Sequence, residues 1–301
     1  MNSQLVIRAE IAPRAIFLRA ADYLALTRPK IGAMVLVTAA LGMFLASAAT
    51  PDAAALGLML LGTGLVSAGA STFNQFVERR SDGRMKRTAG RPLPAGRLNI
   101  SQVVLFGVLL TVGGLVCLMF LPSGPTAAII AGLTFLLYVF AYTPAKRWTW
   151  WNTFIGAVPG AAPPLIGWAA ARGRLDQESL PLFLILFFWQ VPHFLAIAWI
   201  YRDEYRRAGL KMLPALDPSG TRTVRAMALN TLLLLAASLL PLMFGAGWPY
   251  AAGAVILGGA WLALVWKFHL FRTARAARLM LWMSLVYLPL VLLLLLGDRL
   301  L

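Results

Sequence analysis

The sequence predicts an all-α polytopic membrane protein with nine transmembrane helices. Of its 301 residues, 60% are hydrophobic and only 13% are charged, and the mean hydropathy is +0.76. A soluble domain carries about 25% charged residues. Apolar runs recur along the chain, each long enough to cross the ~30 Å hydrocarbon layer as a helix. Helices are expected because a spanning segment must satisfy its own backbone hydrogen bonds.

The expected spans form one intramembrane domain at 31–301, preceded by a cytoplasmic N-terminal segment at 1–30. Two spans, 152–171 and 226–245, contain Pro or polar interruptions, which a bundle tolerates. An odd number of spans places the two termini on opposite sides of the bilayer. The nine expected spans are 31–49, 53–75, 101–121, 125–142, 152–171, 180–200, 226–245, 248–266 and 279–297.

The charged residues predict the orientation of the bundle. The formal net charge is +16, and all but three of the 27 Lys and Arg residues lie in the N-terminal segment or in the loops after spans two, four, six and eight. The exceptions are Arg172, Arg174 and Arg299. Because cytoplasmic loops are rich in Lys and Arg, we expect the N-terminus and these loops in the cytoplasm and the C-terminus outside. Topology thus explains the basic charge, and no nucleic-acid partner is expected.

An amide and two carboxylates follow one another at the end of the second span. Asn74, Glu78 and Asp82 lie at i, i+4 and i+8, so on a helix they share one face, with roughly 6 Å between successive positions. Three oxygen-bearing side chains in a row suit Mg²⁺, which binds one or two carboxylates together with substrate phosphates. The single cysteine, Cys117, lies in an apolar span, so no thiolate metal site is expected. The alternative is a solvated helix end whose acids pair with neighbouring arginines.

A second acidic pair, Asp203 and Glu204, follows the sixth span. Adjacent residues of a helix point about 100° apart, so we expect only one of the two to face a shared ion. Like the first motif, this pair emerges where a helix leaves the membrane, and basic residues and a Pro follow it. A second metal-binding motif and an amphipathic interfacial helix both fit this pattern.

Basic side chains near the acidic motifs are candidates to hold a diphosphate. Arg can bind phosphate oxygens through two N–H groups, whereas Lys acts as a point charge. Carboxylates and cations together at a membrane boundary suit a metal-bridged diphosphate, although the positive-inside rule also explains each cation on its own. The candidates are Arg28, Arg87, Arg91, Lys146 and Arg147.

His193 lies deep inside the sixth span. An imidazole at this depth normally lines a cavity or bonds to a neighbouring helix. A role as a ligand or an acid–base group is the functional alternative.

Together these motifs resemble the UbiA-type intramembrane prenyltransferases. The first acidic motif of that family is similar to Asn74-x3-Glu78-x3-Asp82-x2-Met-x-Arg-Thr-x2-Arg-Pro-Leu, and the second to Glu204-Tyr-x2-Ala-Gly-x2-Met-Leu-Pro214. Further stretches resemble the branch of the family that farnesylates protoheme IX, and all occur in the right order between residues 28 and 214. They are Tyr142-Thr-Pro-x-Lys-Arg, Asn152-Thr-x-Ile-Gly-x3-Gly-Ala-x-Pro-Pro-Leu-Ile-Gly-Trp168 and Trp189-Gln-x-Pro-His-Phe.

The resemblance implies a bundle around a central cavity that opens towards lipid and is capped by the two acidic loops. It implies that Asn74, Glu78, Asp82 and Glu204 hold Mg²⁺ and the prenyl diphosphate, and it favours Glu204 within the second acidic pair. The chain departs from the family pattern at Glu204, where Asp is more usual, and at Arg80, where Asp is frequent. We expect the departure at Arg80 to remove a possible metal ligand.

The resemblance also implies a reaction. Farnesyl diphosphate and heme b are the expected substrates: the farnesyl group joins the 2-vinyl group of heme b, water adds, and heme O and diphosphate are released. His193, Asn152 and Trp168 are expected to contact heme. The expected location is the bacterial cytoplasmic (inner) membrane, with heme A synthase or a terminal-oxidase assembly as further partners.

Two other functions fit part of the pattern. A prenyltransferase for an aromatic acid or a quinone precursor would carry the same acidic motifs. A secondary transporter would also have polar helix ends, but transporters place their binding groups near the midplane on broken helices. Here the carboxylates gather at one edge of the bilayer, which favours the enzyme.

Overall fold

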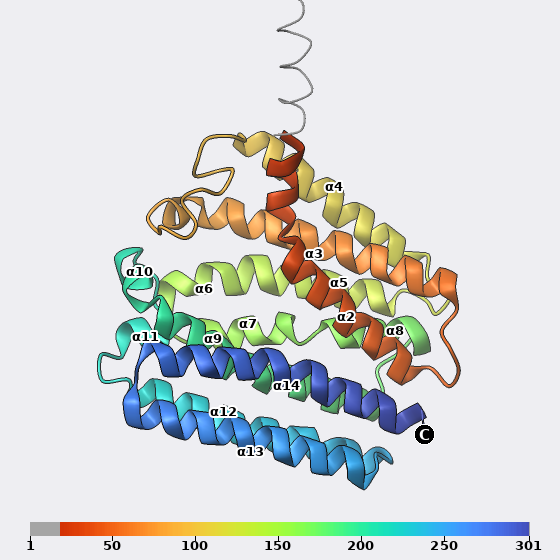
Figure 1. The fold of residues 1–301 in the computed structure, drawn as a ribbon. Coiled ribbons are helices and arrows are strands. Elements are labelled where there is room, and N and C mark those ends of the chain that lie inside the picture. The colour runs from red at the N-terminus through yellow and green to blue at the C-terminus, as the bar shows by residue number, and fades with distance from the viewer. Residues whose placement is uncertain (1–18, 301) are drawn as a thin grey trace, which may run out of the picture.

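Helices make up most of the described chain, residues 19–300, in this computed structural model (Figure 1). Residues 1–18 of the expected N-terminal segment, and Leu301, lie outside the described residues. Nine helical segments within 19–300 are long and apolar enough to cross a membrane. The predicted all-α fold with nine spans is therefore confirmed, and the chain is an integral membrane protein.

Several spans combine more than one helical element: α5, η1 and α6 form the fourth, α7 and α8 the fifth, η2 and α9 the sixth, and α12 and η3 the seventh. The elements are α2 (Pro29–Ala46), α3 (Ala53–Asp82), α4 (Ile100–Met119), α5 (Thr126–Leu136), η1 (Leu137–Tyr142), α6 (Thr143–Trp148), α7 (Asn152–Gly160), α8 (Pro163–Arg172), η2 (Gln177–Ser179), α9 (Leu180–Ile200), α10 (Arg202–Arg207), α11 (Leu213–Leu216), α12 (Thr221–Leu239), η3 (Leu240–Phe244), α13 (Trp248–Phe271) and α14 (Ala274–Leu300).

The second span is longer than its apolar run. The sequence predicts its end at residue 75, but α3 continues without a break to Asp82. The extra turns carry polar side chains that find buried partners inside the bundle, so hydropathy alone underestimates the helix. All three residues of the first acidic motif consequently lie on one continuous helix.

The fifth and fourth spans depart from regular α-helix within their length. The fifth span breaks after Gly160, and α8 begins at Pro163 and Pro164. Proline lacks a backbone N–H, so it is tolerated in the first turn of a helix but interrupts one already formed. The fourth span contains the π-helical stretch η1 directly before α6. Such stretches are frequent at functional sites, and this one leads to Lys146.

Small residues let α2 and α8 pack backbone to backbone. A Cβ atom on Gly42 would collide with the carbonyl oxygen of Pro164, and one on Gly167 would collide with that of Ala39. Membrane helices associate through such close contacts because lipid supplies no hydrophobic force between them. The glycines therefore fix the fifth span against the first.

The helices bury two large apolar cores. One joins α2, α3, α4, α5 and α8, and the other joins α9, α12, α13 and α14 with parts of α7 and α8. Figure 1 shows that the loop after α3, the end of α6, and helices α10 and α11 gather at one end of the bundle. The C-terminus and α8 lie at the opposite end. The central cavity, the cytoplasmic side of the acidic loops and the domain division at residue 30 stay predictions.

Candidate active site

The first acidic motif occupies the last turns of α3, and its side chains point into the protein. Asn74 is fully buried, Glu78 is 8% exposed and Asp82 is 4% exposed. The helix ends directly after Asp82, where the backbone N–H of Gly83 donates to the carbonyls of Arg79 and Ser81. The predicted common face therefore exists, and the alternative of a solvated helix end is wrong.

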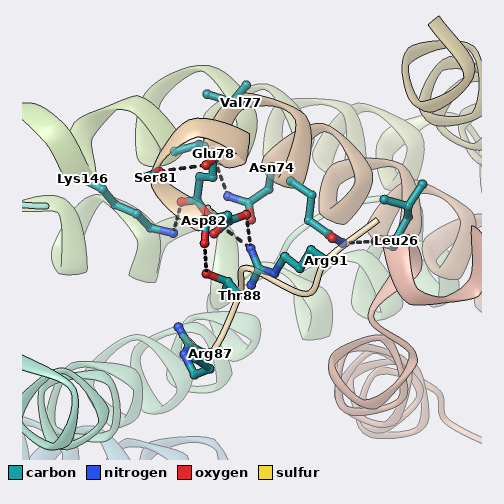
Figure 2. A network of polar contacts seen from close by, with 12 residues as sticks. Leu26, Asn74, Val77, Glu78, Ser81, Asp82, Arg87, Thr88, Arg91 and Lys146 are labelled. Atoms are coloured by element: carbon teal, nitrogen blue, oxygen red, sulfur yellow. Dashed lines mark hydrogen bonds and ion pairs between the residues drawn. The ribbon is translucent and has the colours of Figure 1, made fainter. Parts of the chain in front are cut away.

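Each carboxylate of this motif is paired with a cation from a different segment (Figure 2). Nζ of Lys146, at the end of the fourth span, lies 2.7 Å from Oε1 of Glu78. Arg91, in the loop after α3, pairs with Asp82 and lies 3.9 Å from Oε2 of Glu78. A buried charge without a partner is strongly destabilising, so these two ion pairs offset part of the cost of burying the carboxylates.

The loop after α3 folds back and places Arg91 beside the carboxylates of the first acidic motif. The Thr88 hydroxyl donates to the backbone carbonyl of Asp82 at 3.0 Å, which closes the turn. Burial lowers the pKa of Arg91 below its ordinary value and the nearby Arg28 guanidinium lowers it further, while Asp82 opposes both. Arg28 therefore lies close enough to act on the same site.

Three buried polar atoms of the residues predicted to bind metal or diphosphate have no hydrogen-bond partner among the described residues. They are Oδ1 of Asn74, Oε2 of Glu204 and Nη2 of Arg28. The Asn74 amide donates to Oγ1 of Thr143 at 3.1 Å, which leaves its oxygen free. Buried polar groups are nearly always satisfied by protein, water or ligand, so these two oxygens and one N–H are candidate contacts for a bound molecule.

The backbone of Arg28 is held in an unusual conformation. Its φ of 50° and ψ of 63° place it in the left-handed region, which is uncommon for a residue with a side chain. Such conformations persist where the surroundings enforce them, often at binding sites. Here the conformation turns the chain into α2 at Pro29, and the partly buried Arg28 side chain, whose Nη2 is buried, lies near Arg91 of the same site.

The second acidic loop separates its two carboxylates, as the helical spacing predicts. The Asp203 side chain is 67% exposed and pairs with Arg206 of its own helix at 3.1 Å. Glu204 instead keeps one oxygen buried and free. The structure thus gives the two neighbours different surroundings.

The two acidic loops are in direct contact. Nη2 of Arg87 donates to the Tyr205 hydroxyl at 3.4 Å, and its guanidinium lies 5.3 Å from the centre of the Tyr201 ring. Met85 packs with Ala208 and Leu210 in a small apolar cluster beside Tyr205. Two motifs that are far apart in sequence therefore meet at one end of the bundle.

Backbone contacts tie the segment after η1 to the second loop. The backbone N–H of Lys211 donates to the Lys146 carbonyl at 2.7 Å. The Asn152 amide donates to the carbonyls of Thr149 and Lys211 at 2.6 and 2.9 Å. Asn152 therefore holds this junction together, while its own Oδ1 is buried without a partner.

The remaining predicted residues lie elsewhere. Arg147 is exposed and donates to the Val77 carbonyl at 3.1 Å. His193 contacts Ser284 of α14 at 2.7 Å. Trp168 lies in α8, and the Arg172 guanidinium lies 4.9 Å from the centre of its ring. The three residues expected to contact heme are thus spread along the bundle, with Trp168 at the end opposite the acidic loops.

The sequence profile of the UbiA prenyltransferase family matches residues 35–287. The chain belongs to this family. The match includes every residue of both acidic motifs and of the ion pairs described above, whereas Arg28 precedes it.

Relatives in the family are similar over nearly their whole length. A protein named protoheme IX farnesyltransferase from Solibacter usitatus is 43% identical over 288 residues, which cover 92% of this chain and 98% of that protein. One of the same name from Opitutus terrae is 45% identical over 281 residues, covering 93% of this chain and 95% of that protein.

Solved structures of more distant relatives share the fold. A structure described as digeranylgeranylglyceryl phosphate synthase has a TM-score of 0.78 at 19% identity and covers 93% of this chain and 98% of its own. A UbiA homologue from Archaeoglobus fulgidus bound to DMAPP and Mg²⁺ has a TM-score of 0.66 at 15% identity, covering 92% and 98%.

The departure from the UbiA pattern at Arg80 lies away from the buried acids. Position 80 is exposed and lies about 200° around the α3 axis from Glu78. An Asp here would point to the opposite face of the helix from the paired carboxylates. The loss of a ligand, expected from sequence, therefore does not affect the buried face of the motif.

Proposed function

We propose that this protein transfers the farnesyl group of farnesyl diphosphate to the 2-vinyl group of heme b. Water is added in the same reaction, and the products are heme O and diphosphate. The acceptor is inferred from the names of the relatives, which match this chain over more than nine-tenths of its length. The observation that carries the reaction type is the buried site with two paired carboxylates and three polar atoms that no described residue satisfies.

The donor set suits Mg²⁺ as the cofactor. Mg²⁺ takes oxygen ligands and is bound through one or two carboxylates plus substrate phosphates rather than a full protein cage. Within residues 19–300, no three Asp, Glu, His or Cys side chains lie close enough together to hold a metal ion, so a bound ion would need oxygen atoms of the substrate diphosphate as further ligands. Asn74, Glu78, Asp82 and Glu204 would hold the ion, and bound Mg²⁺ would supply neutralisation of the diphosphate charge.

The protein's own cations assist departure of the diphosphate. As the bond between C1 of the farnesyl chain and oxygen breaks, negative charge grows on the leaving diphosphate, and fixed cations in a dry site stabilise that charge strongly. Arg28 contributes a buried N–H that has no partner within the described chain. Lys146 and Arg91 pair with the carboxylates and hold them in place. In this proposal both cations also lie next to the negative charge of the leaving diphosphate.

Heme b then accepts the farnesyl group through its 2-vinyl substituent. The terminal carbon of the vinyl group forms a bond to C1 of the farnesyl cation, and positive charge moves to the vinyl carbon next to the porphyrin ring. A water molecule adds to that carbon and loses a proton, which leaves a hydroxyethylfarnesyl group. We place His193 at the heme, as a ligand of its iron. Exclusion of bulk water limits hydrolysis of the farnesyl cation.

The remaining features of the proposal concern location and partners. The acidic loops would face the cytoplasm of a bacterium, since they carry most of the Lys and Arg residues. Heme A synthase or a terminal-oxidase assembly is the proposed recipient of the product, because heme O is poorly soluble in water and needs a membrane acceptor.

The test supplies membranes that contain this protein, from a host without its own heme O, with heme b, farnesyl diphosphate and Mg²⁺. Mass spectrometry should detect heme O, and chelation of Mg²⁺ should abolish it. An aromatic acid is offered in parallel. Prenylation of that acid without heme O from a folded protein would contradict the proposed acceptor, and uptake of a solute without any prenylated product would contradict the enzyme.

A further inference from the structure

A polar contact deep in the bundle joins the sixth and ninth spans. Nδ1 of His193 in α9 lies 2.7 Å from Oγ of Ser284 in α14. Nε1 of Trp189, one turn before His193, donates to the backbone carbonyl of Ser284 at 2.7 Å. Ser284 is fully buried. Ser284 of α14 therefore forms hydrogen bonds with two side chains from the same face of α9.

The hydrogen bonds of Ser284 decide which nitrogen of His193 carries the proton. A serine hydroxyl has one hydrogen to donate, and Oγ of Ser284 donates it to the carbonyl of Leu281. A carbonyl can only accept, so this short contact requires the serine hydrogen. Oγ must then accept from His193, and Nδ1 must be the protonated nitrogen. The neutral imidazole is thereby fixed in the form whose Nε2 has a free lone pair.

Aromatic neighbours fix the ring in one orientation. The indole of Trp189 stacks on the imidazole with centroids 4.7 Å apart and planes at 21°. Phe194 meets the ring edge to face at 5.2 Å and 81°. The imidazole is only partly buried, and within residues 19–300 its Nε2 receives no hydrogen bond. Nε2 of His193 thus has a lone pair in a fixed direction and no hydrogen-bond partner among the described residues.

The distance between this lone pair and the acidic loops suits the binding of heme b, the proposed acceptor of the farnesyl group. His193 and Tyr201 are eight residues apart on the same helix, or about 12 Å along its axis. Tyr201 contacts Arg87 of the first acidic loop. A porphyrin whose iron is bound at Nε2 would lie on the membrane side of the diphosphate site, where the farnesyl chain must extend.

We propose that Ser284 is a positioning residue for the acceptor: by accepting the Nδ1–H of His193 it directs the Nε2 lone pair of His193 at the iron of heme b. This inference rests on the proposed function, since it takes heme b as the acceptor. Histidines that bind metals usually donate their other N–H to a fixed acceptor, and loss of that partner weakens metal binding roughly 10- to 100-fold. Trp189 supports the arrangement by stacking on the ring and bonding to the same residue.

The test is a double-mutant cycle read by heme binding. Ferric heme b is titrated into the purified protein in lipid nanodiscs, and the absorption spectrum gives its Kd and spin state. The variants are Ser284→Ala, His193→Ala, both together, and Ser284→Thr, which keeps the hydroxyl. Ser238→Ala is the matched control, because Ser238 is also fully buried and bonds to Tyr287 of α14 but to no histidine.

We expect Ser284→Ala to raise the Kd for heme about 10- to 100-fold and to change the spin state, while Ser284→Thr and Ser238→Ala stay close to the parent. In the His193→Ala background, Ser284→Ala should have no further effect, because the two residues act as one unit. An equal loss in both backgrounds, or an unchanged Kd and spectrum in Ser284→Ala, would overturn the inference.

Heme O formation is measured on the same samples, so that two failures can be told apart. A parent protein that binds heme through His193 but makes no heme O contradicts the proposed function and leaves the role of Ser284 intact. A parent protein that makes heme O while Ser284→Ala binds heme normally contradicts only the role of Ser284.

Discussion

The two acidic loops resemble each other in sequence but balance their charges in different ways. In the first loop, Glu78 and Asp82 are buried and each contacts a cation of the protein. In the second, Asp203 faces solvent, while Glu204 keeps a buried oxygen without a partner in the described chain. The first loop is thus ion-paired without a ligand, whereas the second has a buried carboxylate oxygen with no partner among the described residues.

This difference assigns distinct tasks to the two loops. A site that is already ion-paired stays folded without substrate, because buried charges have their partners. A free buried carboxylate oxygen costs stability until something binds it. We infer that the first loop forms the fixed part of the diphosphate site and that the second loop closes on it through Glu204.

The largest effect is expected from Asp82→Asn. It removes a carboxylate that would hold Mg²⁺ against the diphosphate, and heme O formation should fall by at least roughly 100-fold, the size of effect seen when a group that stabilises the transition state is lost. Product is measured by mass spectrometry, and detergent-solubilised protein is checked for folding. Asp52→Asn is the control, since Asp52 caps the other end of α3 by accepting from the Ala55 N–H and should keep full activity.

Lys146→Met should damage both stability and binding. It leaves Glu78 buried without its nearest cation, and breaking a buried pair costs about 3–5 kcal/mol. Thermal unfolding in detergent should show a clear fall in midpoint, and the KM for farnesyl diphosphate should rise. Adding Glu78→Gln to this variant should restore the midpoint without restoring turnover. Recovery of turnover in the double variant would show that the pair has only a structural role.

The neighbours Asp203 and Glu204 provide a matched pair within the second loop. Glu204→Gln removes the charge of the buried oxygen, and we expect a fall in turnover of roughly 10- to 100-fold with little change in the unfolding midpoint. Asp203→Asn alters an exposed ion pair, which contributes at most about 1 kcal/mol, and should change turnover less than twofold. The reverse order of effects would mean that the wrong carboxylate has been assigned.

The smallest effect concerns Asp217, which anchors the second loop to α12. Burial raises the pKa of Asp217, but hydrogen bonds from Thr223 and Ser219 outweigh it and hold the pKa below its ordinary value. The ionised form therefore stabilises the fold at pH values above the unfolded pKa of about 3.9, and this contribution is lost as the pH falls through the lower folded pKa. Asp217→Asn should remove this acid sensitivity at a cost of roughly 1 kcal/mol, measured by unfolding at pH 3 to 7.

Local patterns in the sequence predict much of the fold and part of the site. Apolar runs locate all nine spans because membrane helices must be long and apolar. The spacing of Asn74, Glu78 and Asp82 predicts their common helical face, and the adjacency of Asp203 and Glu204 predicts that they point apart. These features depend only on helical geometry, which the structure bears out.

The partners of these residues could not be predicted, because they come from distant parts of the chain. Nothing near Glu78 in sequence indicates Lys146, and nothing near His193 indicates Ser284. The two backbone carbonyls that accept from the Asn152 amide, at the junction with the second loop, are likewise not indicated by its own stretch of sequence. Such contacts depend on how the helices pack, and sequence spacing holds no information about that packing.

The most direct test of the central claim is a structure of the protein with Mg²⁺ and a non-hydrolysable analogue of farnesyl diphosphate. The account predicts that the diphosphate lies between the two acidic loops, within hydrogen-bonding distance of Arg28 and linked through Mg²⁺ to Asn74 and Glu204. A diphosphate bound at the opposite end of the bundle, or bound by the first loop with Glu204 still free, would contradict it.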